Sequence, residues 1–340
     1  MRTVRIALAG VGNVGRGFLQ LMRDKGDVVR ERYGIDMLLV SAADRSGVVV
    51  NHDGIDAAAL LRLKESGVGV AGYSGGRPGE GPIAALDGAD VLLESTLTDL
   101  KTGQPGLDVI RTALERGLDV VSANKGPLVL AYGDLTARAK AAGRQLRFSA
   151  AVCSGLPTVN IGRRDIVAAT IDRMEGIFNS TTNYILEAMA TGASFQEALA
   201  EAQRVGVAET DSSLDIEGWD TANKLVIIAN SVLGIPATLD NVQVQGIQGI
   251  GAGDLQAAQA AGQAIRLLAT AQRRADGGYD LSVKPTTLAA GHPMTQVHGW
   301  QMGIVYYTDI TGVLSATVDE FGPVPTGAAM LRDVIDIYSA

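Results

Sequence analysis

The chain has 340 residues, 46% of them hydrophobic, which is enough for two domains with buried cores. Its net charge of −8, with scattered basic residues, excludes the clustered basic face that nucleic-acid binding requires. The single cysteine, Cys153, excludes an internal disulfide, and the three histidines lack metal-ligand spacing, so we expect no metal site. No apolar run reaches the ~20 residues of a membrane span, and no signal sequence precedes the first strand, so we expect a cytoplasmic protein.

Apolar segments alternate with helical segments in the first half of the chain. Strands are predicted at 4–9, 37–43, 90–94, 118–122 and 145–151. Helices are predicted from about 18 to 32 and at 55–65, 107–117 and 134–143. Because each crossover must return across a sheet face, such strands pair in parallel. We therefore predict an α/β fold whose residues 1–150 form a doubly wound parallel-sheet (Rossmann) domain.

The pattern of elements changes beyond residue 155. We expect a helix at 156–167, a strand at 170–178 and helices from 181 to 233. Strands follow at 242–246, 263–274, 279–289, 300–309 and 313–318, although 263–274 fits a helix equally well. Strands in such a run form a mixed or antiparallel sheet, which predicts an α+β domain over 151–326. A last helix, at about 327–340, is expected to pack back on the first domain.

A glycine-rich turn, Gly10-Val11-Gly12-Asn13-Val14-Gly15, follows the first strand and opens the first helix. In this pattern the first glycine allows a tight turn, the second lets a pyrophosphate approach the backbone, and the third allows close packing of helix on strand. The helix N-terminus then attracts the pyrophosphate. The turn in this setting predicts dinucleotide binding rather than a purely structural role.

The second strand ends in Asp44, and Arg45 follows it. A carboxylate at this point accepts hydrogen bonds from the adenosine ribose and repels a 2′-phosphate, which favours NAD. An arginine can instead bind a 2′-phosphate through two hydrogen bonds, which favours NADP. The choice between NAD and NADP stays open, with a slight preference for NAD.

The segment Ser122-Ala123-Asn124-Lys125-Gly126-Pro127-Leu128 begins at the end of a strand of the first domain. Cofactor chemistry gathers at the carboxyl ends of parallel strands. A lysine there can exchange a proton with a substrate hydroxyl, whereas the alternative is an exposed lysine before a proline turn.

Carboxylates and a lysine are concentrated between Gly206 and Lys224. Asp220 and Lys224 are four residues apart, so they share one helix face. An exposed pair of this kind is usually only a solvated surface. The apolar run after Lys224 indicates a buried helix instead, where a charge pair is costly and more often functional.

The segment from Gly176 to Leu186, GIFNSTTNYIL, reads as a strand, a polar turn and a helix. Asn179 to Thr182 are helix-cap candidates, and their polar groups could also line a cofactor–substrate crevice. Cys153 is expected to be a small buried residue rather than a nucleophile.

In order and spacing, these motifs together resemble the homoserine dehydrogenase family. The resemblance runs from GVGNVG through SANKGPL, GIFNSTTNYIL, EAQRVGVAETD and DIEGWDTANKLVIIAN to YYTDITG, and it covers nearly the whole chain. The chain stops where the short members of the family stop, so no regulatory domain is expected.

The resemblance implies NAD(P)-dependent hydride transfer between homoserine and aspartate semialdehyde in a homodimer, with the second domain serving substrate binding and dimerisation. Lys125 and Lys224 match the catalytic lysines, which handle the hydroxyl proton. The expected substrate-binding residues are Glu209, Asp215, Asp220, Ser180 and Thr181. The expected coenzyme-binding residues are Gly10, Gly12, Asn13, Val14, Gly15, Asp44, Arg45, Ser95, Thr96, Ser122 and Asn124.

Five positions depart from the family's pattern while the lysines and acids remain. They are Ser149 for a glutamate tied to a monovalent-cation site, Ser180 for glycine, Val207 for tyrosine, Ser212 for proline and Met302 for asparagine. These departures leave two alternatives open: the same chemistry on another hydroxy acid or hydroxy amino acid, and a dinucleotide-binding relative without turnover. An acylating semialdehyde dehydrogenase is disfavoured, because Cys153 has no histidine near it in sequence.

Overall fold

The computed structural model describes residues 1–339 and divides the chain into two units. Unit 1 contains residues 1–155 and the C-terminal segment from Gly322, and unit 2 contains residues 156–321. Residue 340, the last of the helix expected at 327–340, lies outside the described residues.

Unit 1 is built on a seven-stranded sheet with the order β4-β3-β2-β1-β5-β6-β7. The neighbouring strands β2, β1, β5, β6 and β7 pair in parallel. Strands β3 and β4 extend the sheet at the β2 edge in antiparallel pairs. The strands are β1 (Arg2–Ala9), β2 (Ile35–Asp44), β3 (Gly47–Val50), β4 (Arg77–Pro78), β5 (Val91–Glu94), β6 (Asp119–Ser122) and β7 (Leu146–Arg147). The predicted α/β class and parallel sheet are confirmed.

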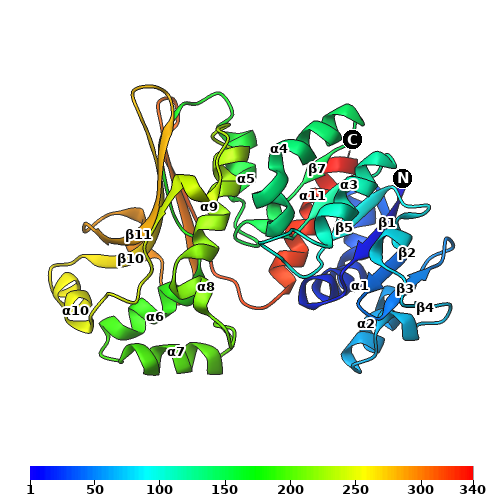
Figure 1. Ribbon diagram of the computed structural model, residues 1–340, viewed down its shortest axis with the longest axis horizontal. Helices are drawn as coiled ribbons and strands as arrows, with labels where there is room; N and C mark the ends of the chain where they lie inside the picture. Colours follow the sequence, from blue (N-terminus) through cyan, green and yellow to red (C-terminus); the bar gives the residue numbers. More distant parts are fainter. Residues whose placement is uncertain (340) are drawn as a thin grey trace. The chain divides into compact units, whose positions relative to one another are not determined.

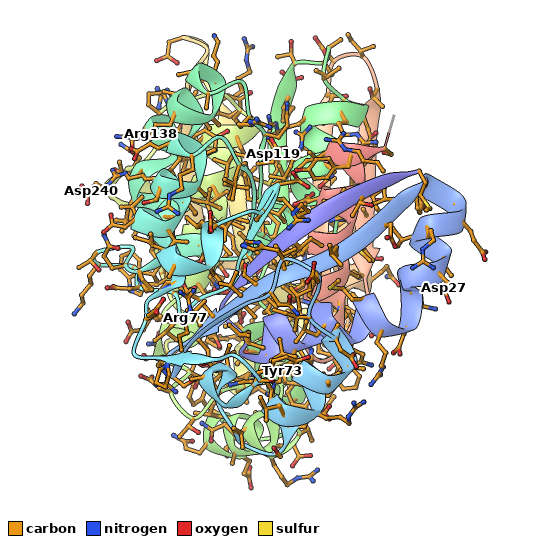
Figure 2. All side chains as sticks on the ribbon, turned by 90° about the vertical axis from the view of Figure 1, so that its right-hand side faces the viewer. Asp27, Tyr73, Arg77, Asp119, Arg138 and Asp240 are labelled. Carbon is orange, nitrogen blue, oxygen red and sulfur yellow. The ribbon has the colours of Figure 1, made fainter. Side chains whose placement is uncertain are left out.

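Helices pack around this sheet in two pairs, α1 with α11 and α3 with α4 (Figure 1). The helices of unit 1 are α1 (Asn13–Tyr33), α2 (Ala57–Glu65), α3 (Gly106–Glu115), α4 (Lys125–Ala141) and α11 (Val324–Tyr338), with 3-10 turns η1 (Val70–Gly72), η2 (Pro82–Leu86) and η3 (Ser149–Ala151). The α1–α11 contact is close because Gly17 and Gly327 have no side chains: a Cβ on Gly17 would meet the backbone of Pro323. Asp27 and Arg77 lie on the outside of the unit, whereas Asp119 is buried and accepts a hydrogen bond from Tyr338 (Figure 2).

Two local predictions in unit 1 were wrong. The strand expected at 145–151 is only Leu146–Arg147, because Ser149 donates its backbone N–H and its hydroxyl to Asp333 of α11 instead of to the sheet (2.8 and 2.6 Å). Helix α4 begins at Lys125 rather than at 134, since the Asn124 side chain caps it and Pro127 stands in the first turn, where it removes no helical hydrogen bond. The short edge strands β3 and β4 were not predicted.

Unit 2 is built on a six-stranded sheet with the order β13-β12-β8-β10-β11-β9. All neighbours are antiparallel except β9, which runs parallel to β11. The strands are β8 (Ile171–Ile177), β9 (Val242–Val244), β10 (Ala264–Arg273), β11 (Tyr279–Leu288), β12 (Met302–Thr308) and β13 (Gly312–Val318). Residues 263–274, which also fitted a helix, are therefore a strand.

The helices of unit 2 lie mostly between β8 and β9 in sequence. They are α5 (Thr158–Asn160), a π-helical turn η4 (Ile161–Asp165), α6 (Ser180–Ala190), α7 (Phe195–Arg204), α8 (Ser213–Ile216), α9 (Trp219–Ser231), η5 (Leu239–Asn241), α10 (Ala252–Ala260) and η6 (Pro293–Gln296). The helix expected at 156–167 is only α5 and η4, because Pro157 and a switch to i→i+5 bonding interrupt it. Helix α10 was not predicted. Helices α6, α9 and α10 all contact strand β10.

Candidate functional site

The turn between β1 and α1 has the geometry that its glycines predict. Gly10 has a φ of +92°, and a Cβ there would overlap the backbone of Ser95, while a Cβ on Gly15 would overlap the Gly10 carbonyl. A Cβ on Gly12 would meet no atom within 4 Å, so this glycine leaves open space at the start of the helix. Such a cradle over the first amides of α1 fits the pyrophosphate of a dinucleotide.

Asn13 and Val14 form the first turn of α1. Asn13 is exposed and accepts a hydrogen bond from Arg16 Nη2 at 2.6 Å, and Val14 is half-buried. No side chain caps this helix end in the part of the chain that is described, which leaves its amides open to an anionic group.

Asp44 lies at the end of β2 with its carboxylate already engaged. Oδ1 accepts the N–H and the hydroxyl of Ser46 (2.9 and 2.5 Å), and Oδ2 accepts the N–H of Val70 (3.1 Å) and the ammonium of Lys64 on α2. Burial raises the pKa of this carboxyl, but the Lys64, Ser46 and Val70 donors outweigh burial and lower the pKa below its usual range. Asp44 is therefore an ionised carboxylate whose four acceptor positions are all occupied.

Arg45, the next residue, is exposed, and its side chain makes no hydrogen bond or ion pair within residues 1–339. Two consecutive residues at the end of β2 thus carry a neutralised carboxylate and an exposed guanidinium. Lys64, which neutralises Asp44, was not among the predicted site residues. Its only signal in the sequence is a place at the end of a predicted helix.

The ends of β5 and β6 meet around a fully buried carboxylate, Glu94. Thr96 donates its N–H (2.9 Å) and hydroxyl to it, Ser122 donates its hydroxyl (3.0 Å), and Asn124 donates its amide (3.3 Å). Burial raises the pKa of the Glu94 carboxyl, and these donors oppose that rise. Ser95 instead donates its hydroxyl to the Gly10 carbonyl at 2.8 Å. These four predicted coenzyme-binding residues therefore hold the strand ends and the glycine turn in place.

Lys125 is the first residue of α4 and is half-buried. Asn124 before it is almost fully buried and caps the helix by accepting the Gly126 N–H at 3.1 Å. The lysine thus begins a helix at the carboxyl end of a parallel strand, which is where the cofactors of such sheets bind.

In unit 2, Lys224 and Asp220 form a buried ion pair on α9. Lys224 Nζ lies 2.7 Å from Asp220 Oδ2, and both side chains are only 12% exposed. The same ammonium donates to the Phe178 carbonyl at the end of β8 at 2.5 Å. The helix face that carries the pair is therefore buried, as the apolar run after Lys224 indicated.

Asp215 joins this pair through Asn179. The Asn179 amide donates to Asp215 Oδ1 at 2.7 Å and to Asp220 Oδ2 at 3.0 Å. Burial raises the pKa of the Asp215 carboxyl, the Asp220 carboxylate raises it further, and Lys224 and Asn179 oppose the rise. We call Asn179, Asp215, Asp220 and Lys224 the carboxylate–lysine cluster. Asn179 was predicted to cap a helix or to line the cofactor–substrate crevice, and its place between two carboxylates was not predicted.

The other predicted substrate-binding residues lie beside the cluster or outside it. Thr181 is buried, and its hydroxyl donates to the Val207 carbonyl at 3.0 Å, while Ser180 is the half-buried first residue of α6. The Glu209 carboxylate is exposed and makes no hydrogen bond or ion pair within residues 1–339, so the structure does not bring it into the cluster.

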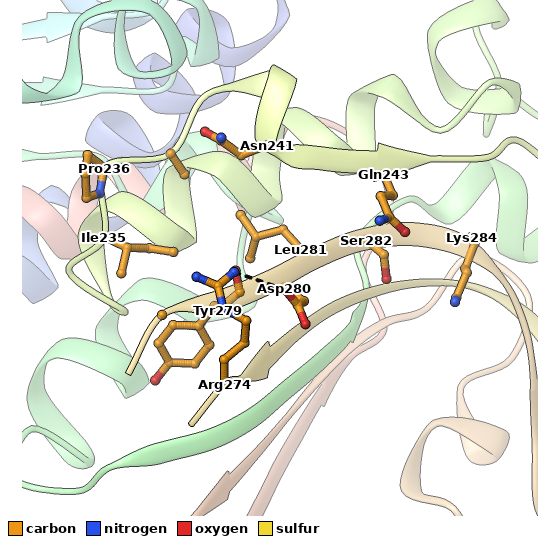
Figure 3. A pocket seen from close by; sticks show the side chains of 12 residues that line it. Ile235, Pro236, Asn241, Gln243, Arg274, Tyr279, Asp280, Leu281, Ser282 and Lys284 are labelled. Carbon is orange, nitrogen blue, oxygen red and sulfur yellow. Dashed lines mark hydrogen bonds and ion pairs between the residues drawn. The ribbon is translucent and has the colours of Figure 1, made fainter. Parts of the chain in front are cut away.

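A pocket of about 480 Å³ lies elsewhere, at the β9–β11 edge of the unit 2 sheet (Figure 3). Its lining includes Arg274, Asp280 and Lys284 and contains none of the predicted site residues. Among residues 1–339 no group of three or more His, Cys, Asp or Glu side chains could hold a metal ion. No helix within the same residues is long and apolar enough to cross a membrane.

Comparison with known proteins gives a consistent result over the whole chain. A family model described as homoserine dehydrogenase matches residues 157–335. The NAD(+)-dependent homoserine dehydrogenase of Pseudomonas canavaninivorans is 32% identical over alignments covering 100% of this chain and 97% of that protein. The homoserine dehydrogenase of Methanocaldococcus jannaschii is 34% identical over 98% of both chains. The crystal structure of an Archaeoglobus fulgidus protein described as a homoserine dehydrogenase superposes with a TM-score of 0.89, at 32% identity, over 99% of this chain and 100% of that one.

A glycine turn open to a pyrophosphate and a buried lysine paired with a carboxylate suit an NAD(P)-dependent oxidoreductase, and the similar proteins show that this is the class of the protein. The similarity along the full chain makes the assignment specific. The chain belongs to the homoserine dehydrogenase family.

Proposed function

We propose that the protein interconverts homoserine and aspartate semialdehyde with NAD or NADP as coenzyme. The observation that carries this proposal is the carboxylate–lysine cluster of unit 2, in which a buried lysine lies within hydrogen-bond reach of a carboxylate. Two carboxylates and one ammonium leave the cluster one negative charge in excess. That excess suits a substrate carrying a single ammonium group.

Oxidation of homoserine removes a hydride from its hydroxyl-bearing carbon and a proton from the hydroxyl. A bound nicotinamide supplies the hydride acceptor, held by the glycine turn and the N-terminus of α1. Lys224 and Lys125 are the proposed proton carriers, and Asp220 orients Lys224 through their ion pair. Asp215, Asp220 and Glu209 are proposed to bind the substrate ammonium, and Ser180 and Thr181 its carboxylate.

The test is coenzyme reduction, followed by absorbance, when homoserine is added at high pH with NAD and with NADP. The same assay with a panel of other hydroxy acids and hydroxy amino acids measures the substrate specificity. Lys224→Met is expected to abolish turnover and leave coenzyme affinity intact, whereas Lys140→Met, a change to an exposed lysine of α4, should leave both unchanged. Absence of turnover of homoserine with either coenzyme contradicts the proposal.

For the coenzyme, we infer weak discrimination between NAD and NADP. The Asp44 carboxylate has no unoccupied acceptor position for a ribose hydroxyl, and Lys64 neutralises the charge that would repel a 2′-phosphate. Arg45 is open to solvent and to such a phosphate. A ratio of kcat/KM values for the two coenzymes above about 100, corresponding to roughly 3 kcal/mol, contradicts this inference.

We also propose a homodimer in the cytoplasm. Strand β13 at the edge of the unit 2 sheet exposes Val313, and the turn before it exposes Ile310, which supports an interface on this side. A lone cysteine and no disulfide are typical of a reducing compartment. Light scattering should give twice the chain mass of 35.3 kDa, and a single-chain mass at micromolar concentration contradicts the dimer. Fractionation of the source cells tests the location.

A further inference from the structure

Asn179 occupies the junction between strand β8 and helix α6, where its side chain binds both carboxylates of the cluster. It is 6% exposed, and its backbone is extended. Its side-chain oxygen accepts the N–H of Thr182 at 2.9 Å and the Thr182 hydroxyl at 3.1 Å, which is the cap of α6. Because the helix cap uses the oxygen, the orientation of the amide is fixed, and its nitrogen must face the other way.

The amide nitrogen has two hydrogens, and both are used. One is donated to Asp215 Oδ1 at 2.7 Å and the other to Asp220 Oδ2 at 3.0 Å. The two acceptors come from different helices, α8 and α9, and repel each other as like charges. A neutral donor between them reduces this repulsion without adding a charge that would compete with a substrate ammonium.

Asp220 Oδ2 is also the atom that accepts Lys224 Nζ, and Lys224 donates to the carbonyl of Phe178, the residue before Asn179. The end of β8 therefore binds the cluster at two points. The Phe178 carbonyl accepts a hydrogen bond from Lys224, and the Asn179 amide donates hydrogen bonds to the two carboxylates. Capping of α6 requires only the side-chain oxygen of Asn179, so the two hydrogen bonds that its amide nitrogen donates indicate a second role.

We propose that Asn179 is a positioning residue for the reaction: its amide holds Asp215 ionised for the substrate ammonium and fixes the Asp220 oxygen that orients Lys224. The charged groups facing the amide are Asp215 from α8 and Asp220 and Lys224 from α9. The inference rests on the proposed function, since it assigns the substrate ammonium to this cluster.

The test compares Asn179→Ser with the wild type. Serine keeps the cap acceptor of α6 but loses the two donated hydrogen bonds. Because a hydrogen bond to a charged acceptor stabilises the ionised form, the acidic limb of the kcat/KM profile should move up by about one pH unit or more. The KM for homoserine should rise by about tenfold, a change of 1.4 kcal/mol, with coenzyme affinity unchanged.

Ser194→Ala is the matched control, because Ser194 caps α7 as Asn179 caps α6, and its hydroxyl has only the capping partner Glu197 among residues 1–339. It should lower thermal stability and leave the pH profile and KM unchanged. If Asn179→Ser behaves as this control does, the inference is overturned. Asn179→Asp keeps the helix cap and adds a third carboxylate, so the acidic limb of its kcat/KM profile should move further in the same direction. This variant replaces Asn179→Ser in the test if the serine variant does not fold.

A titration of the aspartate carboxyl carbons by NMR separates this inference from the proposed function. Should the wild type fail to oxidise homoserine, the proposed function is wrong, and the titration alone decides the role of Asn179. A higher Asp215 midpoint in Asn179→Ser than in the wild type supports that role, and an unchanged midpoint overturns it.

Discussion

At the scale of single residues, the chemistry of a carboxylate depends on which donors reach it. Asp44 has the position that favours NAD in sequence, yet Lys64, Ser46 and Val70 fill its acceptor positions. Lys64 is twenty residues away in the chain, and no local pattern indicates that the two meet. Local sequence therefore indicated this carboxylate as a candidate but did not predict its hydrogen-bond partners.

Replacing Lys64 by methionine should change the coenzyme preference. Without the ammonium, Asp44 regains an acceptor position for a ribose hydroxyl and an uncompensated charge that repels a 2′-phosphate. The ratio of kcat/KM for NAD over NADP should rise by about tenfold, as expected for the loss of one charge-assisted hydrogen bond. Steady-state kinetics with both coenzymes measure it, and Lys25→Met, at an exposed position of α1, is the control. An unchanged ratio contradicts this account of Asp44.

Asp215 should govern the acidic limb of the pH profile. Its pKa is raised by burial and by Asp220. In its proposed role it therefore binds the substrate ammonium above that raised pKa and loses this binding as the pH falls through it. Asp215→Asn should lower kcat/KM by about tenfold or more near neutral pH and remove this limb. Asp211→Asn changes an exposed carboxyl of the same segment and should keep the limb. If the acidic limb persists in Asp215→Asn, the limb belongs to another titrating group.

At the scale of elements, predictions were good where a pattern is local and poor where a distant partner intervenes. The strands β1, β2, β5 and β6 and the helices α2 and α3 lie close to their predicted ranges, because burial on both faces produces continuous apolar runs. Strand β7 is short because Asp333, 184 residues further on, binds the backbone at Ser149. Helix α4 begins before its predicted start, since Pro127 in its first turn removes no helical hydrogen bond.

The turn between β1 and α1 allows a paired experiment on two of its glycines. Gly12→Ala adds a Cβ that meets no atom within 4 Å, so the fold should remain while coenzyme affinity falls by about tenfold or more. Gly10→Ala places a Cβ at positive φ against the Ser95 backbone, which should lower the unfolding free energy by about 1–3 kcal/mol. Thermal denaturation and coenzyme titration measure the two effects. Equal loss of stability in both variants contradicts the assigned roles.

At the scale of the whole molecule, unit 1 is completed by the last helix of the chain. Helix α11 packs on α1, and its Asp333 is buried against Ser149, joining the two ends of the unit. Burial raises the pKa of Asp333 to about 6, with Ser149 opposing the rise. This carboxyl therefore links the stability of unit 1 to pH.

The sign of that linkage follows from the raised pKa. The unfolded chain ionises Asp333 near its ordinary value, while the folded chain keeps the proton until the pH reaches about 6. The unfolding free energy should therefore fall between about pH 4 and pH 6, by up to about 3 kcal/mol. Asp333→Asn can still accept from Ser149 N and does not titrate, so its stability relative to wild type should increase over this range. Denaturation of both proteins across the range measures the difference, and a constant difference contradicts the linkage.

The sequence by itself determined the α/β class, the glycine turn and the family, because these depend on local periodicity, glycine placement and the spacing of motifs. Only the tertiary structure decided which side chains meet: Lys64 with Asp44, Ser149 with Asp333, and Asn179 with Asp215 and Asp220. The physical reason is that a carboxylate is controlled by its nearest donors, and those donors come from elements that lie 20 to 184 residues away in the chain.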